Sequence, residues 1–272
     1  MPELPEVEVV VRGLQPKLIG RKISKVNVRR PGVVSHGSPK ELNQIIGHEI
    51  QSVYRRSKLI IFGLSDDLHL TTHLRMTGKY VYSPTQIPLH NHDRVIFILD
   101  DGASLHYNDC RAIGKIELLK SDVELQEKNF KLGVEPLSSE YKDYPLYNNL
   151  RERNVSIKSF LMNSAYITGL GNIYVSEVLA RTGIRPTKIT NKISRRKSEL
   201  LKKNIPLLLN EAIRKNGTSI KDFKKIDSKN GEFQDFLWVY GKNGQPCRKC
   251  SSLICRIVQN QRSSFYCPSC QK

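Results

Sequence analysis

The chain has 272 residues, of which 39% are hydrophobic, and it carries a formal net charge of +18. This length predicts about two domains with real hydrophobic cores, and the lack of an apolar run of about 18 residues excludes a transmembrane helix. The acidic start contains no apolar segment and argues against a secretory signal, so we expect a soluble intracellular protein.

The positive charge is concentrated in the second half of the chain. Residues 1–150 contain 20 Lys and Arg against 18 Asp and Glu, whereas residues 151–272 contain 24 against 8. Such a composition indicates a polyanion binder. Nucleic acid is favoured over an anionic membrane because no basic amphipathic anchor stands out.

The first predicted element is a helix of roughly four turns near the amino terminus. Pro5 suits a first helical turn, and Gly20 is expected to end the helix. The apolar positions recur at helical spacing and would form one buried stripe: Val7, Val10, Val11, Leu14 and Leu18.

Acidic residues gather at the start of this helix. Glu3, Glu6 and Glu8 lie where the helix macrodipole favours negative charge, so helix chemistry accounts for them. It does not account for Pro2, which would become the amino terminus if Met1 were removed.

Between residues 22 and 120 the chain contains short β-rich runs separated by turn signals, without long helices between them. The runs occupy residues 22–32, 48–64, 67–82, 94–109 and 114–120. This spacing predicts a sandwich or a barrel. Residues 133–148 then indicate an irregular linker.

From residue 155 onward the pattern becomes helical. Candidate helices lie at residues 157–163, 172–183 and 194–217. Pro206 falls inside the last of these, so we expect a kink or a break there.

The stretch ITGLGNIYVSEVLARTG, residues 167–183, carries two glycines before a helix. Gly169 and Gly171 would let the backbone approach a ligand closely, and Asn172 could cap the helix that follows. Two helices joined by such turns could grip a phosphodiester backbone. Taken alone, a plain helix–turn–helix packing motif is the commoner explanation.

The carboxyl-terminal cysteines have the spacing C-x2-C-x16-C-x2-C, at Cys247, Cys250, Cys267 and Cys270. This spacing predicts one tetrahedral zinc ion, and its role should be structural because four thiolates leave no position open for water. A disulfide pair is the alternative, and it is disfavoured without a secretory signal. Cys110 and Cys255 are not expected to be ligands.

The segment RIVQNQRSSFYC lies between the two cysteine pairs and alternates as a hairpin does. It would project Gln261 and Arg262 from a module that zinc holds rigid. In so basic a region, Arg262 is predicted to contact a phosphate.

Six motifs now occur together in one order: PELPEVE, RRSK before an apolar strand, HLRMTG, GLGNIY, VYGKNGQPCRKC and QRSSFYCPSCQ. In this order and spacing the whole chain resembles the bacterial formamidopyrimidine-DNA glycosylases.

The resemblance implies an α+β fold, with an N-terminal helix plus a β-sandwich domain, and then a helical helix-two-turns-helix domain that ends in a zinc-finger β-hairpin. It also implies a monomer that acts in the bacterial cytoplasm. The implied divisions are a catalytic domain, a linker, a helical DNA-binding domain and a zinc finger, at residues 1–135, 136–150, 151–230 and 236–272.

The implied activity is that of a bifunctional DNA glycosylase and AP lyase of base excision repair. It would excise 8-oxoguanine and formamidopyrimidines from duplex DNA through a Schiff base on Pro2, and then cleave the strand by β,δ-elimination. Pro2, exposed by removal of Met1, would be the nucleophile, Glu3 the general acid and base, and Lys58 a lysine near the lesion and its phosphate. A damaged base must leave the helix stack before such an enzyme can act on it.

The resemblance also implies a set of DNA contacts. Met76 and Arg111 would fill the gap that the extruded nucleotide leaves, with Arg111 paired to the orphaned cytosine. His73, Asn172 and Arg262 would grip phosphates, and His92 and Lys158 are weaker candidates for the same task.

The sequence departs from the family pattern at NDCRAIG, residues 108–114. The family commonly has a proline, two basic residues and a phenylalanine, where this chain has Cys110, Arg111, Ala112 and Ile113. Ile113 can fill space between bases but cannot stack, and stacking on an aromatic ring is worth roughly 1–3 kcal/mol per base. Lesion search or discrimination of the opposite base would therefore be altered.

Two alternatives belong to other classes. One is a glycosylase of the sister branch, which acts on oxidised pyrimidines, although that branch usually has glycine where this chain has Leu4. The other is a non-catalytic zinc-containing DNA-binding paralogue. The ranking of lesions would depend on a capping loop within residues 216–233, whose lysines and glycines predict mobility.

Overall fold

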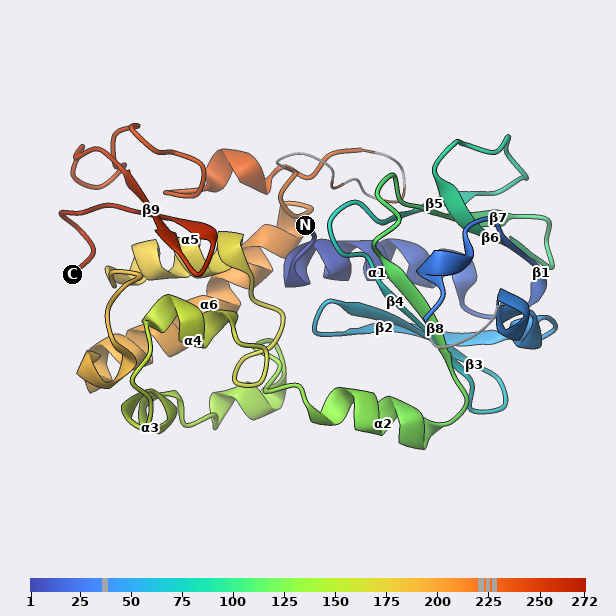
Figure 1. Cartoon of the computed structure of the whole chain (residues 1–272), viewed down its shortest axis with the longest axis horizontal. Coiled ribbons are helices and arrows are strands. Elements are labelled where there is room, and N and C mark those ends of the chain that lie inside the picture. The colour runs from blue at the N-terminus through green and yellow to red at the C-terminus, as the bar shows by residue number, and fades with distance from the viewer. Residues whose placement is uncertain (36–38, 220–222, 224–225, 227–228) are drawn as a thin grey trace. The chain divides into compact units, whose positions relative to one another are not determined.

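A computed structural model describes residues 1–35, 39–219, 223, 226 and 229–272. The chain divides into two compact units (Figure 1). The first comprises residues 1–131 with 215–234, and the second comprises residues 132–214 with 235–272. Among the described residues, no helix is both long and apolar enough to cross a membrane.

The first unit opens with helix α1, Leu4–Leu18. Pro5 lies in its first turn, and Gly20 adopts a φ of 82° just beyond its end. All five positions of the predicted apolar stripe are buried in the core of the unit. The helix is therefore confirmed, and burial of its stripe is what holds it in place.

Two four-stranded antiparallel sheets follow, with the strand orders β1-β6-β7-β5 and β2-β3-β4-β8. The strands are β1 Ile23–Val28, β2 Ile50–Arg56, β3 Leu59–Leu64, β4 His69–His73, β5 Lys79–Ser83, β6 Asp93–Leu99, β7 Ser104–Asn108 and β8 Lys115–Leu119. Short 3₁₀ helices at Pro31–Val33 and Pro39–Ile45 and helix α2, Asp122–Phe130, complete this part of the chain.

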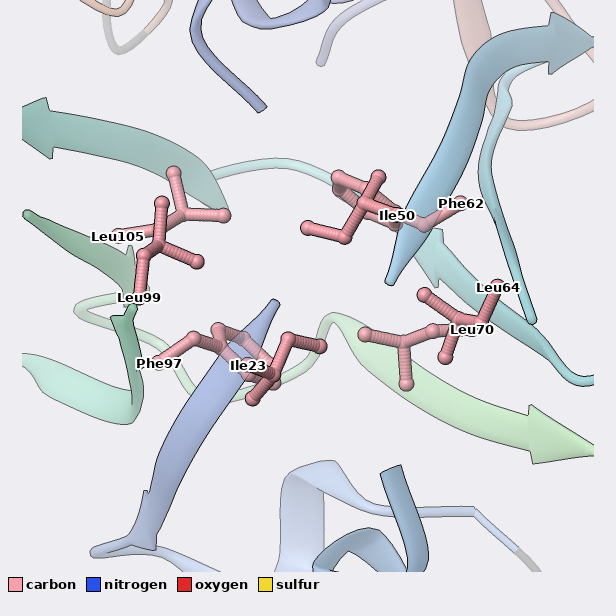
Figure 2. A pocket seen from close by; sticks show the side chains of 8 residues that line it. All are labelled: Ile23, Ile50, Phe62, Leu64, Leu70, Phe97, Leu99 and Leu105. Carbon is pink, nitrogen blue, oxygen red and sulfur yellow. The ribbon is translucent and has the colours of Figure 1, made fainter. Parts of the chain in front are cut away.

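The core of the sandwich is made of side chains that alternate along the strands. Val95, Phe97 and Leu99 of β6 belong to this core, whereas Ile96 between them is also buried but lies outside it, because successive side chains of a strand point to opposite faces. Figure 2 shows eight apolar side chains from strands β1, β2, β3, β4, β6 and β7 around a void of only about 10 Å³. The predicted sandwich is confirmed, and this part of its interior is too small and too apolar to hold a polar ligand.

The second unit is mainly helical. Its helices are the 3₁₀ helix Ser139–Lys142, α3 Leu146–Arg151, α4 Ile157–Met162, α5 Asn172–Thr182, the 3₁₀ helix Thr190–Lys192 and α6 Arg195–Arg214. Helix α5 packs against α6 and against strand β10. The stretch expected to be an irregular linker therefore contains a 3₁₀ turn and the first turn of α3.

Helix α6 is continuous through Pro206, so of the two expected outcomes, a kink or a break, the break is wrong. A proline in a helix removes one backbone hydrogen bond and costs about 3 kcal/mol. The helix continues because its apolar face is buried on both sides of the proline, at Leu201, Ile205, Leu208, Leu209, Ala212 and Ile213. Tertiary packing offsets the local cost.

The chain ends in a two-stranded hairpin of β9, Cys255–Gln259, and β10, Arg262–Tyr266. The two-residue turn between them has φ values of 47° at Asn260 and 59° at Gln261. Positive φ at both turn positions is typical of the hairpin turn that matches strand twist. The predicted hairpin is confirmed. A short 3₁₀ helix, Phe233–Phe236, precedes this region.

Candidate functional site

Pro2 and Glu3 are buried at the start of helix α1, whereas Met1 is 45% exposed. The carboxylate of Glu6 fixes this start. Its Oε2 accepts the backbone N–H of Glu3 at 2.8 Å, and its Oε1 accepts the backbone N–H of Thr218 at 2.8 Å. Glu6 thus joins the first turn of α1 to a segment 212 positions later. Its role therefore goes beyond the favourable interaction with the helix macrodipole that the sequence predicts.

Lys58 lies in the turn between β2 and β3, directly after Ser57, which has a φ of 57°. The next residue, Leu59, pairs with His73 at the end of β4. The antiparallel register therefore brings Lys58 and His73 to the same end of one sheet.

The electrostatics of His73 follow from this position. Burial, and then the positive charges of Arg75, Lys58 and Lys128, lower the pKa of His73 to about 4. The imidazole is consequently neutral near pH 7. Its Nδ1 accepts the backbone N–H of Arg75 at 3.0 Å, so its proton resides on Nε2, which is a neutral hydrogen-bond donor.

Two loops of the first unit meet through Met76 and Arg111. The Nη1 of Arg111 donates to Sδ of Met76 at 3.1 Å. Met76 is 41% exposed, and Ile113 in the same loop as Arg111 is 37% exposed. Met76 and Arg111 are therefore in contact at the surface of the unit, and Ile113 is exposed two residues further along the same loop.

A buried carboxylate supports both loops. Asp109 is 0% exposed and accepts the hydroxyl of Thr77, beside Met76. It also accepts the backbone N–H groups of Arg111 at 3.1 Å and of Gly114 at 2.8 Å. Because one carboxylate binds both loops, their positions are not independent.

His92 is exposed and connects to the same loop through Arg94. The Nη2 of Arg94 lies 3.4 Å from Nδ1 of His92. The same guanidinium donates to the backbone carbonyl of Asp109 at 2.7 Å and to that of Cys110 at 3.2 Å. Arg94 thus fixes the spacing between His92 and the loop that carries Arg111.

In the second unit, Lys158 and Asn172 both reach the zinc-finger hairpin. Lys158 is 2% exposed and donates to the carbonyl of Ser263 at 2.9 Å and to Oγ of Ser264 at 2.6 Å. The Nδ2 of Asn172 also donates to the Ser263 carbonyl, at 3.0 Å. Arg262, the residue before Ser263, is exposed. Lys158 and Asn172 thus hold the hairpin at the residues that directly follow Arg262.

The predicted capping role of Asn172 is wrong. Asn172 is the first residue of α5, and Gly171 occupies the N-cap position. The side chain of Asn172 is instead used for the hairpin contact, which no local signal in the sequence reveals.

A cleft of about 290 Å³ lies next to Lys158, between helix α4 and the hairpin. Its lining combines two cationic side chains with amides from three others: Lys158, Arg262, Asn163, Gln259 and Asn260. Such a mixture of cations and amide donors suits an anionic oxygen ligand.

The four predicted zinc ligands converge at the base of the hairpin. The sulfur atoms of Cys247, Cys250, Cys267 and Cys270 all lie within 4.8 Å of one another, and none of these residues forms a disulfide. Backbone N–H groups point at two of the sulfurs, from Lys249 to Cys247 and from Cys270 to Cys267, each at 3.4 Å. Four converging thiols with such N–H donors fit one structural zinc ion.

Trp238 packs beside the first cysteine pair. Arg248 and Lys249, between Cys247 and Cys250, lie 5.0 Å and 4.7 Å from the centroid of its ring, and Arg181 of α5 lies 5.3 Å from it. Cation–π contacts of this kind join the metal-binding segment to helix α5.

Glu177 anchors the segment before the zinc finger. Its buried carboxylate accepts three consecutive backbone N–H groups, from Trp238 at 2.7 Å, Val239 at 3.0 Å and Tyr240 at 2.9 Å. Burial raises the pKa of Glu177, and these three hydrogen bonds oppose that rise. Through these hydrogen bonds, Glu177 fixes residues 238–240, which precede the zinc finger, to helix α5.

The positioning roles of Glu6, Asp109 and Glu177 were missed at the level of sequence. For Glu177 a signal exists, because it lies one helical turn after the buried Tyr174 and just before Val178, and so falls on the apolar face of α5. Asp109 offers no such signal, since its partners come from a different loop.

Comparisons with known proteins agree with these features. Residues 1–116 match the N-terminal domain of formamidopyrimidine-DNA glycosylase, residues 132–224 match its H2TH domain, and residues 244–272 match a zinc finger found in FPG and IleRS. The formamidopyrimidine-DNA glycosylase of Lactobacillus helveticus is 40% identical over 272 residues, covering 100% of this chain and 99% of that protein. The one from Pelotomaculum thermopropionicum is 41% identical over 274 residues, with the same coverage.

Solved structures give the same result. The complex of Lactococcus lactis Fpg with DNA containing an abasic site matches with a TM-score of 0.91 and 36% identity over 99% of both chains. The complex of MutM with DNA containing carbocyclic 8-oxo-G matches with a TM-score of 0.91 and 36% identity over 100% of both chains. By sequence over its whole length and by fold, the chain belongs to the formamidopyrimidine-DNA glycosylase family.

Proposed function

We propose that this protein is a bifunctional DNA glycosylase and AP lyase of base excision repair, which excises 8-oxoguanine and formamidopyrimidines from duplex DNA. The observation that carries the proposal is the buried Pro2-Glu3 pair at the fixed start of α1, in a chain that matches its family over its full length. Similar proteins have been solved with DNA that contains an abasic site, Fapy-dG or carbocyclic 8-oxo-G.

The proposed nucleophile is the secondary amine of Pro2 after removal of Met1. An α-amino group titrates near pH 8, and the positive end of α1 would lower that value, so a usable fraction is neutral. Its nitrogen would bond to C1′ of the damaged nucleotide while the bond from C1′ to the base breaks. Opening of the sugar ring would then give an iminium ion, whose positive charge accepts electrons in the eliminations that follow.

Glu3 is proposed to move protons in these steps. It would give a proton to the ring oxygen as the sugar opens, and would take protons from carbon in the β- and δ-eliminations that release the 3′ and 5′ phosphates.

Lys58 and His73 are proposed to hold the phosphates around the extruded nucleotide from one end of the sheet. Lys58 would act as a cation near the lesion, and His73 as a neutral donor through Nε2. His92 would contact a phosphate further along the strand, at a spacing that Arg94 fixes.

The void in the duplex would be filled by Met76, Arg111 and Ile113. Arg111 has donors suited to the orphaned cytosine, and Met76 and Ile113 supply apolar volume between the bases. In the second unit, Arg262 and Asn172 are proposed phosphate contacts, and the zinc ion would keep the hairpin that carries Arg262 in one shape.

The remaining assignments are also proposals. The protein would be a monomer that acts in the bacterial cytoplasm in association with the nucleoid. Its divisions would be a catalytic domain, a linker, a helical DNA-binding domain and a zinc finger, at residues 1–135, 136–150, 151–230 and 236–272. The predicted lesion-capping loop, residues 216–233, lies partly outside the described residues.

Borohydride trapping tests the proposal. Incubation with an 8-oxoguanine duplex and sodium borohydride should give a covalent adduct, and mass spectrometry of the digested adduct should place the sugar remnant on Pro2. A remnant on Lys58 would refute Pro2 as the nucleophile. If no adduct formed, the protein would be the non-catalytic DNA-binding paralogue instead. A second trapping reaction, on a duplex that contains an oxidised pyrimidine, tests the alternative function. A glycosylase of the sister branch would react with that duplex in preference to the 8-oxoguanine duplex.

A further inference from the structure

Arg55 makes two contacts that link distant parts of the first unit. Its side chain is 7% exposed, and its Nε donates to Oε2 of Glu8 at 3.0 Å. Its Nη1 donates to the backbone carbonyl of Ser57 at 2.9 Å. Ser57 is the residue directly before Lys58.

Glu8 and Ser57, which both bond to Arg55, belong to two parts of the proposed active site. Glu8 is in helix α1, the helix that carries Pro2 and Glu3 at its start, and α1 packs against β2 (Figure 1). Ser57 begins the turn that carries Lys58. One guanidinium therefore spans the helix of the nucleophile and the turn of the lysine.

The turn that contains Ser57 and Lys58 has a strained backbone, which the hydrogen bond from Arg55 helps to stabilise. Ser57 adopts a φ of 57°, in the left-handed region that is strained for a residue with a side chain and favours glycine. A hydrogen bond to its carbonyl helps to hold that conformation, and so to set the direction in which Lys58 leaves the backbone.

The Glu8–Arg55 pair is itself well held. Burial disfavours ionisation of Glu8, but hydrogen bonds and positive charges from Arg12 and Arg55 keep the pKa of that carboxyl below its usual value. Glu8 is thus ionised near pH 7. A planar guanidinium has donors in fixed directions, so a bond to Glu8 also orients the donor that reaches Ser57.

We propose that Arg55 is a positioning residue for Lys58, which fixes the lysine relative to the helix that carries Pro2 and Glu3. This inference rests on the proposed glycosylase and lyase function. Arg55 acts through the backbone of Ser57 and need not touch DNA. Its removal should slow the chemical steps and leave duplex binding almost intact, because a misplacement of about 1 Å can cost roughly a hundredfold in rate.

The test compares Arg55→Lys with Arg12→Lys. Both changes keep a positive charge beside Glu8, but Arg12 is 58% exposed and pairs with Glu8 at 2.8 Å within helix α1 itself. A lysine at 55 can bond to Glu8 or to Ser57, but it lacks the fork that reaches both. Arg12→Lys is therefore the matched control for charge and for the loss of a guanidinium.

Arg55→Lys should lower the single-turnover excision rate by roughly tenfold or more, and should change the dissociation constant of the lesion duplex by less than about threefold. Arg12→Lys should change neither by more than about twofold. Glu8→Gln, which weakens the hold on the guanidinium without removing volume, should reduce the rate in the same direction and serves if Arg55→Lys does not fold.

If the wild-type protein excises the lesion and Arg55→Lys does so at the same rate, the inference about Arg55 is overturned and the proposed function stands. An equal loss in Arg12→Lys also overturns it, because the effect would then be general charge near Glu8. If the wild-type protein gives no borohydride adduct, the proposed function fails instead, so the two failures are distinguishable.

Discussion

The Nζ of Lys158 lies 2.6 Å from Oγ of Ser264, although 106 positions separate the two residues. The lysine is 2% exposed and belongs to α4, whereas Ser264 is in the second strand of the zinc-finger hairpin. The ammonium group is thus directed into the hairpin, two residues from Arg262. We therefore expect Lys158 to influence DNA binding through the position of Arg262.

Lys158→Met should lower stability as well as affinity for DNA. It leaves the Ser263 carbonyl and the Ser264 hydroxyl without a buried charged donor, at a cost of about 1–3 kcal/mol in the free energy of unfolding. Arg262→Met, at an exposed position, should weaken DNA binding and leave stability unchanged. Denaturant unfolding and duplex binding of both variants check this, and unaltered stability of Lys158→Met would contradict it.

Salt dependence should separate His73 from Arg262. A neutral donor releases no counterion, whereas each cation on a phosphate contributes about 0.9 to the slope of log K against log salt. His73→Leu should therefore weaken binding by up to about tenfold at every salt concentration, with an unchanged slope. Arg262→Gln should flatten the slope. A flatter slope for His73→Leu would mean that the imidazole is charged in the complex.

Stability should depend on pH through His73. Its pKa is lowered from 6.5 to about 4 in the folded protein, so between these values the unfolded chain binds more protons. The contribution of His73 is therefore constant above about pH 6.5 and is lost as the pH falls toward 4, by at most roughly 3 kcal/mol. Urea unfolding of the wild type and His73→Gln across pH 4–7 measures it, and curves that stay parallel over that range would refute the assignment.

Loss of zinc should be visible in the fluorescence of Trp238, the single tryptophan of the chain. Arg248 and Lys249, between two of the metal ligands, lie over its ring, and these contacts require a folded finger. Chelation or Cys267→Ser should change the emission, remove one zinc per chain and abolish tight duplex binding. Cys255→Ser, outside the ligand set, should keep the metal. Tight binding by the metal-free protein would show that Arg262 is not the phosphate contact proposed.

Ile113→Phe should restore stacking in the loop that departs from the family pattern. Excision of 8-oxoguanine opposite cytosine should rise in single turnover, by at most about tenfold for each 1.4 kcal/mol gained in the transition state. Cleavage of a preformed abasic site should change little, because Pro2 and Glu3 are unaltered. Equal acceleration of both reactions, or of neither, would mean that residue 113 has no role in base extrusion.

The sequence by itself determined the elements whose signals are local. The stripe of α1 follows from helical spacing, the strands of the sandwich from short β-rich runs between turn signals, and the zinc site from the intervals between four cysteines. Such patterns are complete within a short stretch of chain, so no knowledge of distant residues is needed to interpret them. The family resemblance added the roles proposed for Pro2 and Glu3.

Only the tertiary structure decided which charged side chains are buried and what they hold. Asp109 bonds to Thr77 across 32 positions, Glu177 to Val239 across 62 and Glu6 to Thr218 across 212. A charged group leaves water only where partners offset its desolvation, and those partners come from elsewhere in the fold. Tertiary packing also explains why α6 continues through Pro206, since burial of the helix face outweighs a local cost from which the sequence alone predicts a kink or a break.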